Sequence, residues 1–426
     1  MTNKLKPKSE FTRNVLTLMT GTTIAQAIPI AISPILTRIY TPEDFGLFAL
    51  FIAIISIFGS IANGRYELAI MLPKKDEDAI NILALGFIIN MTLSIILLII
   101  VLIFHKPIVN ILNNQDIAPW LYFIPFSVFL MGCFNLLNYF NNRKKLYKDL
   151  AKANVFKSIA MAIVQLSLGF FKAGALGLVS GQLASQIASN TKLFFNIKRL
   201  NLFSKISKIK IIALGKRYKD FPKFSMWATL ANTLAQNLTN ILISSFYSVK
   251  TLGFYSLTQR LLSMPLVLIG TSIGQVFFEE ATNERQKTDR ATKTFNKTLK
   301  KLVIVAIPAF TALYLIIEDL FVFVFGEEWR IAGRYAQILM PLFSIRFVVA
   351  PLTLTAILFE KTSIDLIFQM GLFLLYMLLF IFLRTLSFLE FLYYLNNIIL
   401  VYYLIYLIYL YLLSNKIKLT FRKNFI

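Results

Sequence analysis

The sequence predicts an all-α polytopic membrane protein with about twelve transmembrane helices and both termini in the cytoplasm. Apolar stretches alternate with short polar connections along all 426 residues, and the basic residues concentrate on every second connection. The chain is 57% hydrophobic and carries a formal net charge of +23, a combination that a soluble basic domain would not show. We therefore interpret the charge as membrane topology, with anionic membrane lipids as the default partner and no nucleic acid.

The twelve apolar stretches are the predicted spans, and most reach the roughly 20 residues that a helix needs to cross a hydrocarbon core about 30 Å thick. They cover residues 15–36, 45–63, 79–104, 120–140, 153–171, 174–195, 224–247, 252–278, 302–325, 335–359, 364–383 and 388–413.

The distribution of Lys and Arg orients these spans. The two tails and the even-numbered connections carry 33 basic residues, whereas the odd-numbered connections carry 7. Cationic loops resist translocation, so both termini are predicted to be cytoplasmic in a multi-pass cell-membrane protein. The first stretch is too long for a signal peptide and lacks a small-residue cleavage site, so we expect it to remain as the first helix.

A basic segment divides the spans six and six. Residues 196–223 hold nine Lys and Arg, which predicts an N-terminal lobe of residues 1–195, a cytoplasmic linker of residues 196–223 and a C-terminal lobe of residues 224–426. Within the linker, residues 201–215 mix isoleucines with lysines. This pattern fits an amphipathic helix on the inner leaflet or, equally, a solvated tether.

The two halves share a faint repeat. Ile24-Ala25-Gln26 is matched by Leu234-Ala235-Gln236, and Gly46-Leu47-Phe48-Ala49-Leu50 is matched by Gly253-Phe254-Tyr255-Ser256-Leu257. The matches differ by three residues of slippage, so chance similarity stays the alternative to common ancestry. Halves of six spans each would share one topology, related by an axis along the membrane normal, with a substrate path at their interface.

Polar side chains recur at helical spacing in three spans. Those of span seven fall within an arc of about 80°. The three stripes are Thr229, Thr233, Gln236, Asn240 and Ser244 in span seven, Gln182, Ser185, Gln186 and Ser189 in span six, and Asn154, Lys157, Ser158 and Gln165 in span five. They predict a water-lined cavity, the alternative being hydrogen bonds between packed helices.

Charges within or beside the spans are candidates for function because burying a charge in a bilayer is costly. The basic candidates are Arg346, Arg260, Arg38, Arg65 and Lys157. Such side chains suit an anionic substrate, since Arg matches phosphate oxygens in a two-pronged geometry. For Arg38, Arg65 and Lys157 the alternative is snorkelling to the headgroups.

The carboxylates of the spans lie near span ends: Glu67, Glu318, Asp319, Asp365 and Glu390. There a solvated carboxylate, or a partner for a nearby Arg, is the expected state.

Several classes of chemistry are excluded. The sequence has no P-loop motif, and its single cysteine, Cys133, and single histidine, His105, exclude a disulfide within the chain and a Cys/His zinc site. Lys74 to Asp78 could imitate the paired acids of a metal-dependent glycosyltransferase, but we interpret this isolated run as solvated charge. We expect no cofactor, no metal and no enzymatic activity.

Three sequence islands carry a family resemblance. They are residues 34–46 (PILTRIYTPEDFG), residues 252–257 (LGFYSL) and residues 324–329 (VFGEEW). With the length, the twelve spans and the basic central linker, the chain resembles the polysaccharide (O-antigen-type) flippases of the multidrug/oligosaccharidyl-lipid/polysaccharide exporter superfamily.

That resemblance implies two six-helix lobes around a central cavity that opens alternately to each side. Its implied cargo is an undecaprenyl diphosphate-linked oligosaccharide, moved from the cytoplasmic to the outer face for lipopolysaccharide or other surface-polysaccharide biosynthesis. Related assembly proteins, including a polysaccharide polymerase, are the implied partners. The basic candidates would hold the diphosphate, and Gln236, Asn240, Thr233, Gln182, Gln186 and Gln165 would contact the sugar.

Two other functions remain open at this stage. One is an ion-coupled drug or metabolite exporter of the same fold, although an exporter of organic cations should present buried carboxylates. The other is a membrane glycosyltransferase or polymerase of the same pathway, against which the short outward connections and the missing acid pair count.

Overall fold

The computed structural model describes residues 10–415, except the side chains of residues 10–16, 267–269, 271–272 and 362–364. The basic residues of the two tails, 1–9 and 416–426, lie outside the described residues, so the orientation of the termini stays a prediction. Contacts divide the chain into two compact units, Met1–Gly253 and Phe254–Ile426. The boundaries predicted at residues 195 and 224 likewise stay predictions.

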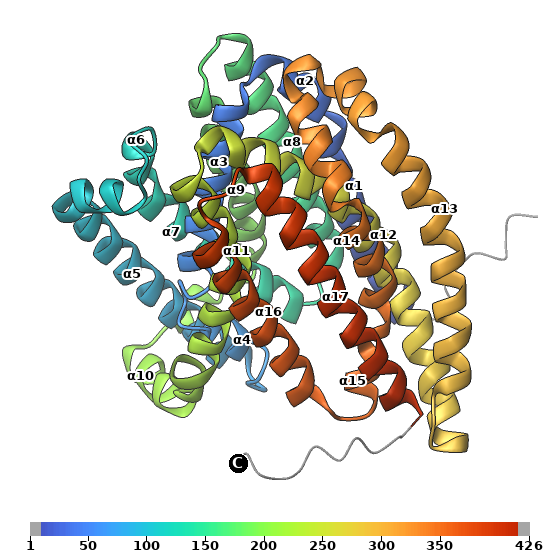
Figure 1. Cartoon of the computed structure of the whole chain (residues 1–426). Coiled ribbons are helices and arrows are strands. Elements are labelled where there is room, and N and C mark those ends of the chain that lie inside the picture. Colours follow the sequence, from blue (N-terminus) through green and yellow to red (C-terminus); the bar gives the residue numbers. More distant parts are fainter. Residues whose placement is uncertain (1–9, 416–426) are drawn as a thin grey trace, which may run out of the picture. The chain divides into compact units, whose positions relative to one another are not determined.

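The N-terminal unit consists of helices (Figure 1). They are α1 (Glu10–Ala31), α2 (Ser33–Ile39), α3 (Pro42–Gly59), α4 (Tyr66–Ala69), α5 (Asp76–Ile111), α6 (Ala118–Leu121), α7 (Phe123–Arg143), α8 (Tyr147–Phe170), α9 (Ala175–Lys198), η1 (Phe203–Lys205), α10 (Lys208–Arg217), η2 (Phe221–Ser225), α11 (Met226–Phe246) and the start of α12 (Val249–Thr288). Helix α8 packs against α1 and α9, α7 packs against α5 and α9, and α3 packs against α7, α9 and α11.

Local sequence explains where these helices begin. The first predicted span is interrupted at Ile32, because Pro34 is favourable only in the first turn of a helix, and α2 starts at Ser33. Helix α3 begins with a capping box, in which the Thr41 and Asp44 side chains each accept from the other's backbone N–H.

The linker contains a helix, as one of the two interpretations of residues 201–215 predicted, but the helix covers only Lys208–Arg217. Helix α10 packs against α5, where Leu214 is buried and the Tyr66 hydroxyl donates to the Gly215 carbonyl at 2.9 Å. A solvated tether is therefore wrong for Lys208–Arg217. The residues before this helix form η1 and a short extended stretch.

The C-terminal unit comprises the rest of α12, then α13 (Thr292–Phe325), η3 (Glu327–Trp329), α14 (Arg330–Leu352), α15 (Leu354–Leu358), α16 (Thr362–Leu383) and α17 (Phe388–Ser414). Helix α14 packs against α13 and α17, and α16 packs against α17. Trp329 is fully buried and meets the edge of the Phe254 ring. At 40 and 34 residues, α12 and α13 are about 60 and 50 Å long, so each exceeds the hydrocarbon core.

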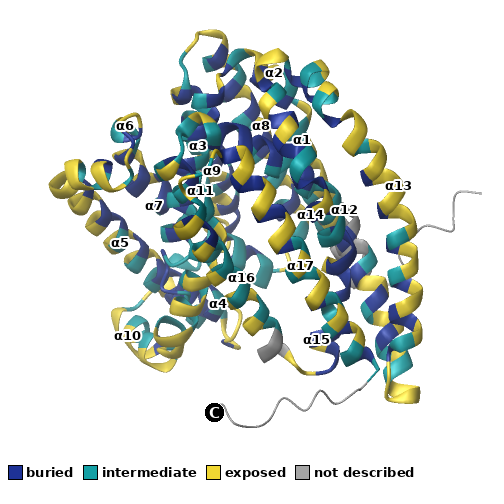
Figure 2. Cartoon of the chain, viewed as in Figure 1, coloured by how far each residue is buried: buried dark blue, intermediate teal, exposed yellow. Residues whose placement is uncertain are grey.

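The prediction of a helical membrane protein is confirmed. Within residues 10–415, nine segments are long and apolar enough to cross a membrane. The three other predicted spans are also helical, in α9, α11 and α12, which carry more polar side chains. Large apolar side chains are exposed along α5 and α13, for example Ile103 at 66% and Phe323 at 82% (Figure 2). Such surfaces suit contact with lipid tails.

Candidate substrate-binding site

Arg346 lies on α14, near the middle of a predicted span, and is surrounded by aromatic rings. Its guanidinium lies 5.0 Å from the centroid of Phe343 and 6.0 Å from that of Tyr403 on α17. Tyr255 of α12 and Tyr376 of α16 also interact with it electrostatically. Within the described residues, no carboxylate lies within 4.0 Å of its nitrogens. Aromatic faces stabilise a cation without neutralising it, so the charge stays available to an anion.

Arg260 is the other basic candidate in the C-terminal unit. It is half-buried on α12, and the part of the chain that the structure describes offers its guanidinium no carboxylate within 4.0 Å. One residue earlier, the Gln259 amide donates to the Tyr255 hydroxyl at 2.7 Å. Tyr255 is thus held by the neighbour of Arg260 in sequence and also contributes to the surroundings of Arg346.

The other three basic candidates lie in the N-terminal unit in different settings. Lys157 on α8 lies 4.7 Å from the Phe134 ring centroid and has no carboxylate partner among the described residues. Arg65 pairs with Glu67 at 3.0 Å, and Arg38 is exposed at the end of α2. Arg346 and Arg260 therefore lie in the C-terminal unit and the other three in the N-terminal unit, and the roles of all five in binding stay predictions.

The three polar stripes differ in exposure. On α11 only Ile243 and Ser244 are buried, Gln236 is exposed, and Thr233 and Asn240 are half-buried. This stripe is therefore accessible to water or ligand, although Thr233 already donates to the Thr229 carbonyl.

The stripes of α8 and α9 are less accessible. Gln165 is buried and donates to the Leu178 carbonyl at 3.2 Å, so it joins the two helices. Gln182 is half-buried, and Gln186 is buried with an Oε1 that lacks a hydrogen-bond partner. Interhelical bonding thus accounts for Gln165, and the sugar contact proposed for these glutamines stays a prediction.

The carboxylates near span ends have partners, which are arginines, as the sequence predicted, for Glu67, Glu318 and Asp319 but not for Asp365 and Glu390. Glu318 pairs with Arg330 at 3.3 Å and with Arg334 at 3.2 Å. Asp319 also pairs with Arg330, Asp365 accepts from the Tyr406 hydroxyl at 2.7 Å, and Glu390 caps α17 through Ser387.

The buried carboxyl group of Glu67 should make the stability of the fold depend on pH. It is 3% exposed, and its Oε2 has no hydrogen-bond partner. Burial raises the pKa of this carboxyl despite the opposing effect of Arg65. The carboxyl group of Glu67 therefore binds its proton more tightly in the folded state than in the unfolded state. As the pH rises above 4.5, the ordinary pKa of a glutamate, the contribution of Glu67 to the stability of the fold falls.

We expect Glu67→Gln to remove that decline, so its melting temperature relative to wild type should increase steadily from pH 4.5 towards about 8. The control is Glu280→Gln, because Lys297 at 2.8 Å holds the pKa of Glu280 below its usual range. The contribution of Glu280 to stability is therefore lost only as the pH falls below 4.5, and the control should run parallel to wild type from pH 4.5 to about 8. Thermal unfolding of purified protein measures both. Parallel pH curves for Glu67→Gln and wild type would refute the assignment.

A close backbone contact joins α3 to the first turn of α12. A Cβ at Gly46 would lie 1.9 Å from the Val249 carbonyl oxygen, and a Cβ at Gly253 would lie 1.8 Å from the Pro42 carbonyl oxygen. Beside them, Glu43 and Lys250 form an ion pair at 3.0 Å. We call residues 42–46 and 249–253 the glycine crossing. Only glycine allows this approach, since any side chain would meet backbone atoms.

The acidic run at Lys74 to Asp78 takes part in ion pairs. Asp76 pairs with Arg143 and Lys144 at 3.1 and 2.6 Å, and Glu77 pairs with Lys210 at 3.0 Å. Among the described residues, no group of three or more His, Cys, Asp or Glu could hold a metal ion. Asp76 and Glu77 therefore form ion pairs, where solvated charge is expected from the sequence.

Together, the helical bundle, its exposed apolar surface and two half-buried arginines without a described carboxylate partner are those of a multi-pass membrane protein of the transporter type. The chain belongs to the polysaccharide biosynthesis protein family, whose model matches residues 35–333. This confirms the family resemblance in the sequence.

Named relatives and solved structures agree with this assignment. The chain is 20% identical to the lipopolysaccharide biosynthesis protein WzxC of Escherichia coli, over 80% of this chain and 68% of WzxC. It is 20% identical to the succinoglycan biosynthesis transport protein ExoT of Rhizobium meliloti, over 75% and 64% of the two chains. It is 26% identical to the teichuronic acid biosynthesis protein TuaB of Bacillus subtilis over 38% of this chain, a match that spans only 33% of TuaB.

Solved structures of other membrane proteins share the fold of this chain. The lipid II flippase MurJ matches with a TM-score of 0.71 at 14% identity, over 93% of this chain and 86% of MurJ. An inward-facing multidrug resistance MATE family transporter of the MOP superfamily matches with a TM-score of 0.67 at 14% identity, over 93% of both chains. At this identity the likeness establishes the fold alone.

Proposed function

We propose that this protein is a flippase that moves an undecaprenyl diphosphate-linked oligosaccharide from the cytoplasmic face of the membrane to the outer face by alternating access. The cargo would supply the assembly of a cell-surface polysaccharide, with a polysaccharide polymerase and related proteins acting next. The observation that carries the proposal is the pair Arg346 and Arg260, which are half-buried in membrane helices without a described carboxylate partner.

The charge of the candidate site favours an anionic cargo over an organic cation. A diphosphate is the part of a lipid-linked sugar that is hardest to take through a membrane, and guanidinium groups provide the donors that it needs. The described carboxylates at the span ends are engaged by arginines, by Tyr406 and by the Ser387 cap. A cation exporter would need such groups free to face its cargo.

Polar uncharged groups suit the sugar portion. Gln236, Asn240 and Thr233 on the accessible face of α11 offer amides and hydroxyls. Gln182 is half-buried on α9 and offers a further amide. Side chains of this kind exchange hydrogen bonds with sugar hydroxyls as readily as with water. WzxC, ExoT and TuaB carry names from polysaccharide biosynthesis, which supports a glycan rather than a drug as the cargo.

The glycine crossing suits the alternating-access part of the proposal. By the predicted topology, it lies at the outer ends of α3 and α11, where the polar connections 37–44 and 248–251 meet. Backbone contact of this kind depends on a few atoms and one exposed ion pair, so it can separate without unfolding either helix.

A gene deletion tests the function as a whole. Cells that lack this protein should lose the surface polysaccharide and accumulate complete lipid-linked repeat units on the cytoplasmic side, and the wild-type gene should restore both. The measurement is protection of the lipid-linked sugar from an external glycosidase. A polymerase would give a different result, because single units would still reach the surface. A drug exporter would leave the glycan unchanged.

A further inference from the structure

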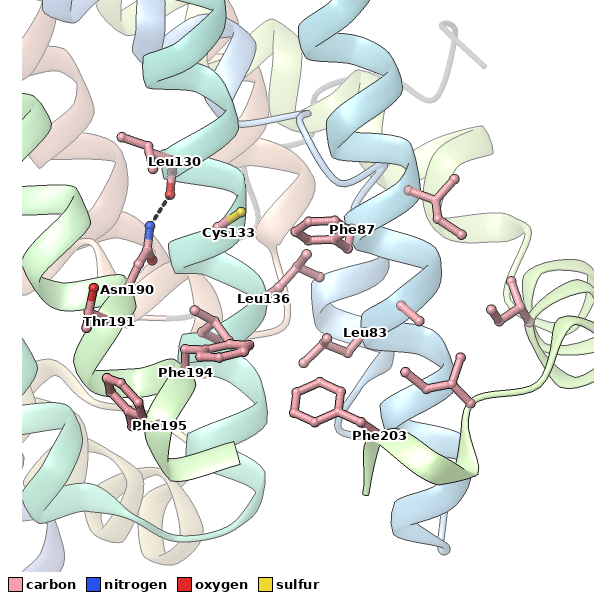
Figure 3. Close-up of a pocket in the computed structure, with 15 residues that line it drawn as sticks. Leu83, Phe87, Leu130, Cys133, Leu136, Asn190, Thr191, Phe194, Phe195 and Phe203 are labelled. Carbon is pink, nitrogen blue, oxygen red and sulfur yellow. Dashed lines mark hydrogen bonds between the residues drawn. The ribbon is translucent and has the colours of Figure 1, made fainter. Parts of the chain in front are cut away.

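The N-terminal unit contains an apolar cavity that the proposed transport cycle does not use. It has a volume of about 560 Å³ and lies between α5, α7 and α9, with η1 and the following residues along one side (Figure 3). Leu83 and Phe87 line it from α5, Leu136 from α7, Phe194 from α9 and Phe203 from η1. All of these elements belong to the unit Met1–Gly253.

The lining selects a hydrocarbon ligand. None of the residues that line the cavity is charged, and its few polar groups are Cys133, Asn190 and Thr191. The Asn190 amide donates to the Leu130 carbonyl at 2.9 Å, the bond drawn in Figure 3. A sugar or a phosphate would lose its hydrogen bonds to water here without replacement, whereas a lipid chain would lose none.

The cavity lies at the depth of the inner leaflet. Leu83 and Phe87 come 7 and 11 residues after Asp76, where α5 begins, which places them about 10 to 16 Å along the helix. The predicted topology puts the start of α5 on the cytoplasmic side. The acyl chains of the inner leaflet occupy this range of depth.

Basic residues border the cavity on that side. Ile206 and Ile211 line it, and Lys205, Lys208 and Lys210 lie next to them in the linker. Lys205 and Lys210 pair with Glu77 at 3.5 and 3.0 Å, which ties the linker to the start of α5. Lys208 is exposed and has no carboxylate within 4.0 Å among the residues described. A phosphate headgroup at this position would meet complementary charge.

We infer that this cavity binds an acyl chain of an anionic phospholipid from the inner leaflet, with the basic linker over its headgroup. The volume is that of a site for one small ligand, and the much longer undecaprenyl tail exceeds it. The bound lipid would fasten the linker to α5 and α9. This site does not depend on the proposed cargo, since it requires only a bilayer that contains anionic lipid.

Photo-crosslinking tests the site directly. The full-length protein is reconstituted in phosphatidylcholine vesicles with a trace of phosphatidylglycerol that carries a diazirine in its acyl chain, and adducts are located by peptide mass spectrometry. We expect adducts on residues 83–88, 130–137 and 190–195. Ala84→Trp, which fills the cavity, should reduce them about tenfold, the change expected when two or more buried methylene contacts are lost.

The matched control is Leu102→Trp, which adds the same ring to α5 at a side chain that is 60% exposed and outside the cavity. It should leave the adducts unchanged. Lys208→Glu should lower the yield with the phosphatidylglycerol probe but not with a phosphatidylcholine probe. Equal labelling by both probes in wild type, unchanged labelling in Ala84→Trp, or labelling of these segments only by a diazirine analogue of undecaprenyl phosphate would each overturn the assignment.

A second measurement needs no substitution. Cys133 is the only cysteine of the sequence and lines the cavity, so its modification by a small apolar maleimide reports occupancy. Adding phosphatidylglycerol to delipidated protein in detergent should slow the modification, and phosphatidylcholine at the same concentration should not. Equal rates with the two lipids would contradict the site even if Ala84→Trp failed to fold.

Discussion

Replacing Arg346 with alanine should abolish most surface polysaccharide while leaving the protein folded in the membrane. The guanidinium lies among Phe343, Tyr403, Tyr255 and Tyr376 and forms no ion pair with a described carboxylate, so its loss breaks no salt bridge. A charge-assisted hydrogen bond contributes about 1.5–3 kcal/mol, so we expect the affinity for the diphosphate to fall about 10- to 100-fold.

Graded variants separate charge from geometry. Arg346→Lys keeps the charge but loses the two-pronged donors, so it should retain intermediate activity. Arg384→Ala is the control, because this arginine is exposed in the connection between α16 and α17. Surface glycan is measured at equal amounts of membrane protein. Wild-type glycan in Arg346→Ala would remove this residue from the binding site and leave Arg260 to be tested in the same way.

Adding a single methyl group at the glycine crossing should strongly reduce both the population of the closed crossing and the export of glycan. In Gly46→Ala or Gly253→Ala, the new Cβ would lie less than 2 Å from a carbonyl oxygen, so the two backbones must separate. Overpacking of this kind costs about 1–3 kcal/mol, equivalent to a 5- to 150-fold loss in the population of the closed crossing. Alanine otherwise favours a helix by about 1 kcal/mol, so destabilisation can come only from the clash.

Cross-linking measures the crossing. In a Cys133→Ser background, Glu43→Cys and Lys250→Cys should be joined by a short bifunctional thiol reagent, because the native side chains meet at 3.0 Å. Either alanine variant should reduce the yield and the export of glycan together. The control is Gly274→Ala, whose Cβ would come no closer than 3.3 Å to the end of the Leu354 side chain and 3.7 Å to the Pro351 backbone. Undiminished cross-linking in both variants would show that the added methyl group does not separate the two backbones.

Much of the fold could be predicted from the sequence because a bilayer requires long apolar helices, and such helices are visible as runs of residues. All twelve predicted stretches are largely helical. The positions at which helices are interrupted or end were harder to predict. The interruption at Ile32 depends on Pro34, and α12 continues past its predicted span to Thr288, where Glu280 pairs with Lys297 of α13.

Less of the candidate site could be predicted. Depth in the span singled out Arg346, but the surroundings of this residue come from three other helices, through Tyr255, Tyr376 and Tyr403, and contacts between distant helices leave no local pattern. The spans that contribute Tyr376 and Tyr403 carried no recognisable motif. Spacing alone also could not separate Gln165, which bonds to Leu178, from the accessible Gln236.

The glycine crossing has a consequence for how such a chain arose. Gly46 and Gly253, Glu43 and Lys250, and Pro42 and Val249 are each 207 residues apart, so the contacts are reciprocal. Gly46 meets Val249 as Gly253 meets Pro42, and Glu43 pairs with its own counterpart, Lys250. A residue that contacts its counterpart lies on a two-fold axis, as in an isologous dimer. On the hypothesis that the halves share an ancestor, a dimer of identical half-length chains would have opposed two equal charges at this position. Only after fusion into one chain could one copy become Glu43 and the other Lys250.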